Sequence, residues 1–590
     1  MESKYEWNLT HIYENEKTFN EDIERLKEKT EEIVSFKGKL SQGADYVLDC
    51  YNKLNEALEL EEKLYGYVML KYNKDMSKTE SIKDYKKIES LLTEFSEKVS
   101  FITPELSKLE DGVLEKYLQE DEELRNNYKK PIEDIIKEKK HILSEELEEV
   151  LAKYSEIFGT SENVYDVLTN TEFDFPEIKD SQGNDLKVTA GLYSKYLTDS
   201  DVSVRKQAFE SMYSLYKRHE NSITEMYLSR VKQRVISAKI RNYKSSLDAA
   251  TANDDSNTNV YEILLNEVNK NLNLNHEYVS LKKKMLDLEE MHMYDVYVNP
   301  LNVNKQIEFE EGKEIVLKAL ATMGDDYLNM LRHAFENNWL DVYEKDNKMG
   351  GGYSMGIHAV HPYILLNYMN TLRDVSTVAH ELGHTMHSYY ASKSQNIINA
   401  NYTIMVAEVA STVNEILLAN YLIQNETDNK KKAALINEQL DTIRATLYRQ
   451  AMFAEFEKIV HSKIEEGEAL ASDNLHEIYL ELVKKYFGND IVIDEEIKYE
   501  WARIPHFYRC FYVYKYATGI TAAIVIASNI LNKKEGYVEK YIDMLSKGGS
   551  MGSLDLLKLV DVDLEKEETY EIAFEYFRKN LEELKNIINE

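Results

Sequence analysis

The chain has 590 residues, of which 43% are apolar and 30% are charged, and its formal net charge is −33. This composition predicts a soluble globular protein, and the length predicts more than one domain. The negative charge argues against a nucleic-acid partner, because phosphate binding needs clustered lysine and arginine side chains. The charge identifies no ligand, although it would favour encounters with cationic peptides.

Cysteine use and the start of the sequence predict a cytoplasmic protein. Cys50 and Cys510 are the only cysteines and stand far apart, so no disulfide framework is expected. The start, Met1–Trp7, has neither a basic region nor an apolar run and predicts no secretory signal. Residues 517–531 are apolar but are interrupted by polar residues, which predicts a buried helix and no membrane span.

The first 150 residues predict successive amphipathic helices. The chain contains only 21 glycines and 6 prolines, which favours long helices. Apolar residues recur at the three- and four-residue steps of one helix face over residues 19–36, 46–72, 78–99 and 112–124. Pro104 and Pro131 predict breaks, and Ser144 predicts the N-cap of a further helix.

A small hairpin and further helices follow. Residues 173–189 alternate apolar and polar side chains around Gly183-Asn184, which is a turn signal. Helical spacing resumes over residues 202–238, 260–288 and 307–332. Residues 341–366 differ, because glycines at 350–352 and 356 precede the β-prone run Tyr363–Leu366.

A possible metal site stands directly after that strand. The run His380-Glu381-Leu382-Gly383-His384 places two histidines four residues apart, on one face if the run is helical. Asp374 or Ser376 could cap the start of this helix. Two imidazoles could then hold one metal ion with Glu381 beside them as a base, although two surface histidines on an ordinary helix would give the same pattern.

A catalytic zinc site needs a third protein ligand. His387 lies on the same face, but one straight helix rarely surrounds a tetrahedral ion with three ligands. The other candidates are Glu408 and Glu415, which lie seven residues apart in an apolar helical pattern over residues 400–422. Carboxylates in an apolar helix are costly to bury unless they are paired or coordinate a metal.

These motifs together resemble oligoendopeptidase F, within the thimet-oligopeptidase-like zinc peptidases. The resemblance rests on His380–His387 (HELGHTMH) and on Ala407–Thr412 (AEVAST) with Glu415. It extends to Tyr363–Tyr368 (YILLNY), to His506–Tyr508 with Phe511–Gly519 (FYVYKYATG), and to His141–Glu146 (HILSEE). It therefore covers most of the chain and is strongest from about residue 340 to 525.

The resemblance implies a role for each matching residue. His380, His384 and Glu408 would be the ligands of one Zn²⁺ per chain, and Glu381 would be the general base. Glu415 would orient a ligating histidine, and His387 would support the helix pair. Cobalt or manganese would also suit such donors.

The tyrosine- and histidine-rich segment would stabilise the negative charge that develops on the attacked carbonyl oxygen. Tyr514 and His506 are the first candidates as donors, and Tyr508 is the next. Helical phase places Tyr508 and Tyr512 on one face and Tyr514 on another, so they cannot all serve equally.

The fold implied is mainly α: a large, two-lobed helical protein with a small β-sheet beside the zinc helix and a deep internal substrate channel. We expect an N-terminal helical domain over residues 1–200, with the hairpin at 173–189, and a catalytic domain over residues 201–590. Gly351, Gly352, Tyr363 and Leu365 are candidate substrate-binding residues, because a peptide could add a strand along Tyr363–Tyr368.

The function expected is zinc-dependent hydrolysis of internal peptide bonds in short, unfolded oligopeptides. The oligomeric state stays open. A carboxypeptidase or dipeptidase on a similar fold is one alternative, and it would need a pocket for a peptide terminus. A non-catalytic acidic helical binding protein is the other, and it would bind no stoichiometric zinc.

Overall fold

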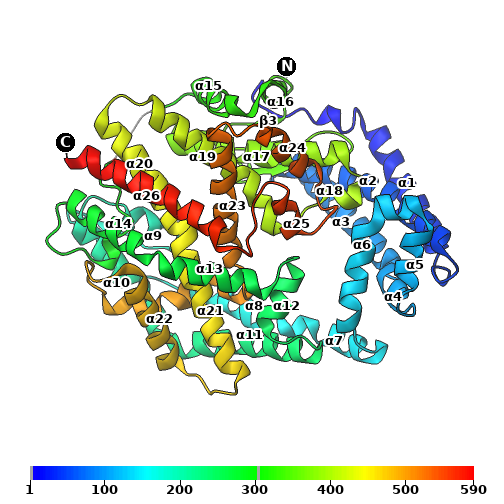
Figure 1. Cartoon of the computed structure of the whole chain (residues 1–590), viewed down its shortest axis with the longest axis horizontal. Coiled ribbons are helices and arrows are strands. Elements are labelled where there is room, and N and C mark those ends of the chain that lie inside the picture. The colour runs from blue at the N-terminus through cyan, green and yellow to red at the C-terminus, as the bar shows by residue number, and fades with distance from the viewer. Residues whose placement is uncertain (1–3, 302–305, 590) are drawn as a thin grey trace. The chain divides into compact units, whose positions relative to one another are not determined.

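The computed structural model describes residues 4–301 and 306–589. The described chain is mostly helical and has two small sheets (Figure 1). It forms two compact units, each built from three stretches of sequence. The first unit contains residues 1–142, 304–422 and 523–563, and the second contains residues 143–303, 423–522 and 564–590. The mainly helical class is confirmed, whereas the boundary at residue 200 stays a prediction.

The first unit carries the N-terminal helices and the HELGH motif. Its helices are η1 (Leu9–His11), α1 (Glu16–Val34), α2 (Ala44–Lys74), α3 (Thr79–Val99), α4 (Ile102–Ser107), α5 (Val113–Glu120), α6 (Glu122–Glu138), η2 (Lys139–His141), α15 (Phe309–Ala319), η5 (Leu320–Met323), α16 (Asp325–Glu336), α17 (Leu372–Ser394), α18 (Ile397–Ala400), α24 (Tyr537–Ser546) and α25 (Ser553–Lys558). Helix α19 (Ile404–Asn425) begins in this unit.

The second unit is also helical and contains the predicted hairpin. Its helices are α7 (Glu145–Phe158), α8 (Thr160–Val167), η3 (Leu168–Glu172), α9 (Ala190–Leu197), α10 (Val202–Arg218), α11 (Glu220–Ile240), α12 (Ser246–Asn253), α13 (Thr258–Lys270), α14 (Leu272–Met285), η4 (Met293–Asp295), α20 (Asn429–Ile443), η6 (Arg444–Tyr448), α21 (Arg449–Glu465), α22 (Ser472–Phe487), η7 (Glu495–Arg503), η8 (Pro505–Arg509) and α26 (Glu567–Asn589). Helix α23 (Tyr514–Leu531) begins here. Strands β1 (Ile178–Lys179) and β2 (Asp185–Leu186) pair antiparallel, as predicted.

The break predicted at Pro131 is present as a kink inside α6. Pro131 lies inside α6, and the departure from helical geometry comes three residues earlier, at Tyr128 (φ −136°, ψ 20°). Proline lacks the N–H that would bond the carbonyl of Asn127. Instead, that carbonyl accepts hydrogen bonds from the side-chain amides of Asn396 (3.1 Å) and Asn399 (2.7 Å). The acceptor that proline leaves free at the kink is therefore satisfied by another segment.

A three-stranded sheet precedes α17, and its strand order corrects one prediction. Strand β5 (Tyr363–Leu365) lies between β3 (Leu340–Asp341), to which it is parallel, and β4 (Tyr353–Met355), to which it is antiparallel. Tyr363 and Leu365 are fully buried in a core that includes side chains of α1 and α2. They cannot pair with an added peptide strand, because β5 is the central strand. The edge nearest the glycines is β4.

Helix α19 is, among the described residues, the one helix long and apolar enough to cross a membrane by length and composition. It is 56% buried over its most apolar window, and it carries Glu408 and Glu415. These features are those of a core helix that presents two carboxylates to its neighbour.

Candidate metal centre

Helix α17 begins earlier than the sequence suggested. Its N-cap is Thr371, whose hydroxyl accepts a hydrogen bond from the backbone N–H of Asp374 at 3.2 Å. The Asp374 carboxylate in turn accepts the backbone N–H of Thr371 at 2.8 Å. The prediction of Asp374 or Ser376 as the cap is therefore wrong, and Asp374 is the third residue of a capping box.

The structure brings together the three residues predicted to hold the metal. The Nε2 atoms of His380 and His384 are 3.2 Å apart, and each lies 3.5 Å from Oε2 of Glu408. Donor atoms about 2.0–2.1 Å from a tetrahedral zinc ion stand about 3.3 Å from one another. Two imidazoles and one carboxylate at this spacing fit zinc.

Gly383 allows α19 to pass close enough to supply that carboxylate. A Cβ atom on Gly383 would lie 2.5 Å from Cα of Ser411 and 2.6 Å from the carbonyl oxygen of Ala410. Nearby, the buried side chain of Asn414 donates to the backbone carbonyl of Ala379 at 3.0 Å. Sequence reasoning assigned no role to Gly383 or Asn414, although a glycine within a helix is one sign of close backbone approach.

Two further contacts orient the donors. His380 uses its other ring nitrogen, Nδ1, to contact Oε1 of Glu415 at 3.1 Å, and Ser411 donates to Oε2 of Glu408 at 3.1 Å. Burial opposes protonation of His380, but the Glu415 hydrogen bond and charge outweigh burial and raise the pKa of His380. The hydrogen bond from His384 lowers the pKa of Glu408. Glu415 therefore lies where it fixes the ring orientation of His380.

Glu381 lies beside these donors with an unpaired oxygen. Its side chain is 6% exposed, and its buried Oε2 has no hydrogen-bond partner among the described residues. Burial raises the pKa of the Glu381 carboxyl, against the opposing charges of the two histidines. The other oxygen, Oε1, lies 3.5 Å from the position that a Cβ on Gly352 would take. The atom nearest to that position is Cγ2 of Thr377, at 3.3 Å.

Two side chains hold the glycine-containing loop in place. The Asn367 amide donates to the backbone oxygens of Met349 (3.0 Å) and Gly351 (2.8 Å). Lys348 is fully buried, and its Nζ donates to Asp341 Oδ1 at 2.7 Å and to the carbonyl of Leu366 at 2.6 Å. The predicted residues Gly351 and Gly352 thus belong to an anchored loop that leads into β4.

His387 takes no part in the three-residue group. Its ring is 1% exposed and stacks on Tyr402 with a centroid distance of 3.5 Å. Burial lowers the pKa of His387 to about 3, so the ring is neutral. The side chain packs α17 against the segment that leads into α19.

The structure does not place Tyr514 and Tyr508 on an accessible surface of their unit. Tyr514 is fully buried and its hydroxyl donates to Asp254 at 3.0 Å. Tyr508 is 2% exposed and stacks on Tyr165 at 4.5 Å between ring centroids. Burial raises the pKa of both hydroxyls well above the usual value. Both tyrosines fill the core of the second unit.

His506 instead shares a half-buried cluster with Tyr512 and Tyr516. Its ring centroid lies 6.1 Å from that of each tyrosine, and the two tyrosine rings are 5.5 Å apart. Burial, and then the positive charges of nearby arginines, lower the pKa of His506. Sequence reasoning weighed Tyr512 but missed Tyr516.

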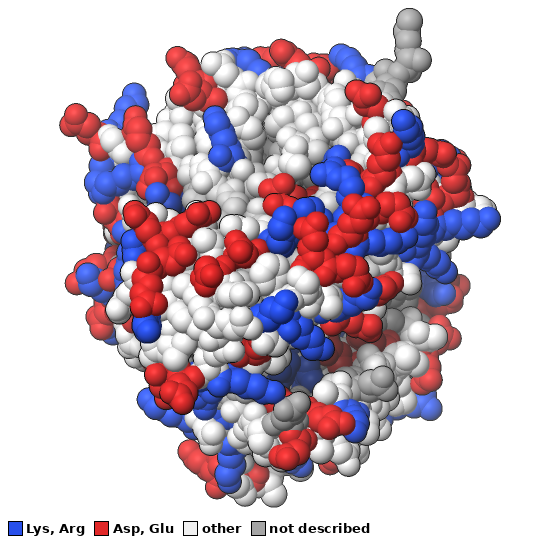
Figure 2. Space-filling view, turned by 90° about the vertical axis from the view of Figure 1, so that its right-hand side faces the viewer, with Lys and Arg blue, Asp and Glu red and all other residues white. Residues whose placement is uncertain are grey.

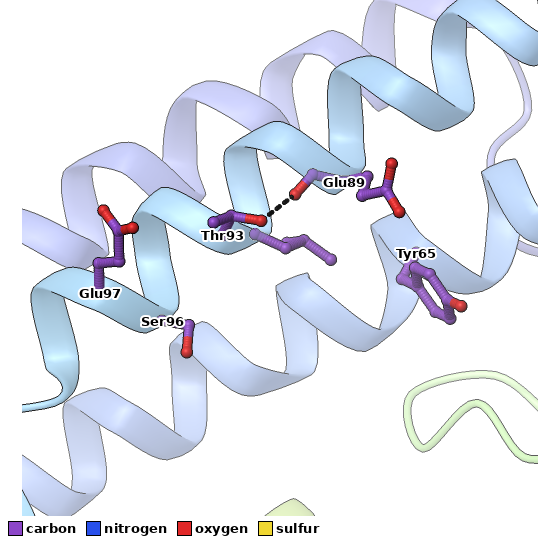
Figure 3. A pocket seen from close by; sticks show the side chains of 6 residues that line it. Tyr65, Glu89, Thr93, Ser96 and Glu97 are labelled. Carbon is purple, nitrogen blue, oxygen red and sulfur yellow. Dashed lines mark hydrogen bonds between the residues drawn. The ribbon is translucent and has the colours of Figure 1, made fainter. Parts of the chain in front are cut away.

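One hollow in the first unit is lined by none of the predicted site residues. It opens between α2 and α3 and is lined by Tyr65, Glu89, Leu92, Thr93, Ser96 and Glu97 (Figure 3). None of these side chains belongs to the metal-ligand group. The predicted internal channel stays a prediction.

Comparison with known proteins decides the family. The model of peptidase family M3 matches residues 195–576, and a model described as oligopeptidase F matches residues 105–175. The chain belongs to peptidase family M3. It is 38% identical to oligopeptidase PepF of Bacillus subtilis, over 99% of this chain and 87% of that protein. It is 37% identical to an oligoendopeptidase F homologue of Borreliella burgdorferi, over 98% of each chain.

Solved structures agree with this M3 assignment. A crystal structure described as a peptidase from Chlamydophila abortus has a TM-score of 0.92 and 32% identity, and covers 99% of this chain and 98% of that one. Oligoendopeptidase F from Enterococcus faecium has a TM-score of 0.74 and 32% identity, and covers 97% and 99%. The predicted resemblance is confirmed, and the protein is a metalloendopeptidase of the oligoendopeptidase F type.

Proposed function

We propose that this M3 peptidase binds one zinc ion per chain and hydrolyses internal bonds of short, unfolded oligopeptides in the cytoplasm. The observation that carries the proposal is the spacing of 3.2–3.5 Å among the donor atoms of His380, His384 and Glu408. Zinc, when bound, supplies a Lewis acid that polarises the scissile carbonyl and lowers the pKa of water. We expect no nucleic-acid or membrane partner.

Glu381 acts as the proton carrier in this proposal. Its buried Oε2, without a partner among the described residues, is free to take a proton from the attacking water and later deliver it to the leaving amine. A raised pKa suits this role, because it brings the carboxyl closer to neutral pH, where the group can both accept a proton and release it. Gly352 leaves room beside the other oxygen.

The substrate backbone pairs with β4 in this proposal. Among the described strands, β4 has one edge without a partner, and its side chains are half-buried. The oxygens and N–H groups of an extended peptide can extend such an edge. The side chain of Ser354 in β4 contacts that of Thr385 in α17 at 2.8 Å, so one face of this strand packs against the helix that carries His380 and His384.

Neutral donors from the segment of His506 stabilise the developing oxyanion. Family resemblance supports the role of this segment. The placement of the rings within their unit favours Tyr512 and Tyr516 as the partners of His506. Tyr514 and Tyr508 are less suitable because each is buried.

An internally quenched peptide blocked at both ends tests the proposal. We expect cleavage of an internal bond, loss of activity with a chelator and recovery with stoichiometric zinc. A carboxypeptidase or dipeptidase would leave the blocked peptide intact and cut the unblocked one from an end. A non-catalytic binding protein would cleave neither peptide and would retain no stoichiometric zinc.

A further inference from the structure

The segment that joins the two helices of the metal centre is held at several points within the first unit. Helix α17 ends at Ser394 and α19 begins at Ile404, and residues 395–403, which include α18, are here called the connector. The ligand Glu408 lies on α19, in its first turns. The position of this carboxylate therefore depends on how the connector is held.

The contact at Gly383 brings α19 close to α17 but leaves other movements of α19 open. A shift of α19 by one residue would move the Glu408 side chain about 1.5 Å along the helix axis and turn it by about 100°. Metal ligands have to lie within about 0.2 Å of their preferred distances. A second fixed point near the start of α19 is therefore needed to keep Glu408 beside the two histidines.

Tyr402 supplies a fixed point on α17. Its ring stacks on that of His387, with 3.5 Å between the centroids and 2° between the planes. Its hydroxyl lies 3.1 Å from the hydroxyl of Ser388, the next residue of α17. Burial raises the pKa of Tyr402 to about 12, with the charge of Glu408 as a further cause and the Ser388 contact opposing both. The tyrosine is thus tied to the helix of the histidines and is near enough to Glu408 to sense its charge.

The loop between α24 and α25 holds the connector at another point. The backbone N–H of Gly549 donates to the carbonyl of Asn399 at 2.7 Å. A Cβ atom on Gly549 would lie 2.0 Å from the carbonyl oxygen of Asn401. The hydroxyls of Thr403 and Ser553 are 2.6 Å apart. Only a glycine at 549 lets this loop lie so close, and the contacts restrict movement of the connector.

The kinked helix α6 makes a third contact, through the carbonyl of Asn127 and the amides of Asn396 and Asn399. Acidic and basic side chains are interspersed over the face of the molecule shown in Figure 2. The contacts that hold the connector are of another kind, because they join uncharged side chains and backbone groups. Salt screens charges, so these contacts should not weaken as ionic strength rises.

We propose that Tyr402 is a positioning residue for Glu408, and that the connector anchored by this ring sets the affinity of the centre for zinc. Without the ring, the start of α19 can shift, and Oε2 of Glu408 leaves its place 3.5 Å from each histidine nitrogen. Residues that orient metal ligands are worth about 10- to 100-fold in metal affinity. This inference rests on the proposed zinc site and adds the part of the chain that keeps its third ligand in place.

The test measures zinc affinity of the metal-free full chain by competition with a chromophoric chelator. We expect Tyr402→Leu to bind zinc about tenfold more weakly than the parent, because leucine cannot stack on His387. Tyr402→Phe keeps the ring and should bind zinc almost as tightly as the parent. Gly549→Ala disturbs the connector from the other contact and should also weaken zinc binding.

A double-mutant cycle shows whether Tyr402 acts through Glu408. Glu408→Gln weakens the third ligand, so the exact position of residue 408 then matters much less. In the Glu408→Gln background, Tyr402→Leu should therefore cause little further loss of zinc affinity. Effects of two residues that act through one contact do not add, whereas independent effects do.

Tyr117→Leu is the matched control for loss of a buried ring in the same unit. Tyr117 lies on α5, and its hydroxyl donates to the backbone carbonyl of Ser41 at 3.1 Å. This variant loses a ring and one hydrogen bond, as Tyr402→Leu does, and should lower the melting temperature without changing zinc affinity. Thermal melting of each metal-free protein measures the loss of stability separately from the loss of affinity.

Equal zinc affinity in the parent and in Tyr402→Leu would overturn the inference, as would a loss of the same size in the Glu408→Gln background. A loss in Tyr117→Leu as large as in Tyr402→Leu would overturn it too, because affinity would then follow general stability. If Tyr402→Leu does not fold, the same cycle with Gly549→Ala decides. A parent that binds one zinc and cleaves the end-blocked peptide while the variants keep full affinity refutes this inference alone. A parent that holds no zinc refutes the proposed function as well.

Discussion

At the level of single residues, the centre depends on where each imidazole nitrogen points. His380 has two ring nitrogens, and the contact of Nδ1 with Glu415 at 3.1 Å leaves Nε2 directed at His384 and Glu408. The spacing of His380 and His384 predicts two of these donors, and only the family resemblance distinguishes Glu408 from Glu415 as the third. The sequence does not predict which carboxylate meets which nitrogen, since that depends on how α17 and α19 pack.

Glu415 is expected to strengthen metal binding without being a ligand. Replacing it by glutamine removes the charge that favours a well-oriented, basic imidazole at His380. We predict a zinc affinity lower by about 10- to 100-fold, measured by competition with a chromophoric chelator. Glu336→Gln, on the exposed surface of α16, is the matched control and should bind zinc normally. An unchanged affinity in the Glu415 variant would contradict the assigned role.

Phenylalanine variants of the tyrosines near His506 distinguish a structural role from a catalytic one. Tyr514→Phe removes a buried hydrogen bond to Asp254 and should cost about 1 kcal/mol of stability, with kcat within a few-fold of the parent. If Tyr512 or Tyr516 supplies an oxyanion donor, its replacement by phenylalanine should lower kcat by about 10²- to 10³-fold. A larger loss of kcat in the Tyr514 variant than in either of the others would reverse this assignment.

At the level of elements, the apolar periodicity predicts the N-terminal helices but not the backbone geometry between η8 and α23. The periodicity predicts α1, α2 and α3 to within a few residues. It fails between η8 and α23, because Cys510 and Phe511 leave helical geometry (φ −7° and +59°) and shift the phase of every following side chain. The assumption of one continuous helix therefore does not give the relative orientation of the Tyr508 and Tyr514 side chains. The left-handed residue Phe511 donates its N–H to the buried carboxyl of Glu457 at 2.7 Å.

The contact between α17 and α19 makes Gly383 intolerant of a side chain. The neighbours of an added Cβ are backbone atoms of Ala410 and Ser411, which cannot rotate away. We predict that Gly383→Ala costs about 1–3 kcal/mol of stability and also lowers zinc affinity, because Glu408 moves away from the histidines. Urea unfolding and chelator competition measure the two effects.

The control for Gly383 is a second helical glycine with open space. A Cβ on Gly519, in α23, would meet nothing within 4 Å. Gly519→Ala should be neutral or stabilising by about 0.5–1 kcal/mol and should leave zinc binding unchanged. Full zinc affinity in Gly383→Ala would show that α19 can approach without the glycine.

The carboxyl of Glu457 gives the second unit a pH-dependent stability. Burial raises its pKa from an ordinary value near 4.5 to about 8. The folded state therefore holds a proton that the unfolded state loses, and stability falls as pH rises from about 4.5 to 8. Glutamine keeps an acceptor for Phe511 and has no proton to lose.

We predict that Glu457→Gln flattens this part of the pH dependence. Parent and variant are compared by urea unfolding at pH 6 and pH 8.5. The parent should lose on the order of a few kcal/mol more than the variant between the two conditions. An equal loss in both proteins would show that Glu457 does not carry the effect.

At the level of the whole molecule, the long-range order of strands decides where a substrate can pair. The sequence predicts β5 correctly as a strand, but not as the central strand, because β3 and β4 come from before it and one of them pairs parallel. Local sequence patterns likewise do not predict that the described chain divides into two units, each built from three separate stretches of sequence. Family resemblance supplied what periodicity could not, namely that the HELGH helix and the AEVAST helix form one centre.

The role of Glu381 as proton carrier is tested most directly by measuring zinc content and turnover together in the parent and in Glu381→Gln. We predict one zinc per chain in both proteins, because Glu381 is not a ligand. We also predict a loss of kcat of about 10²-fold or more on the end-blocked peptide in the variant. Near-normal turnover in Glu381→Gln with zinc bound would show that Glu381 is not the proton carrier.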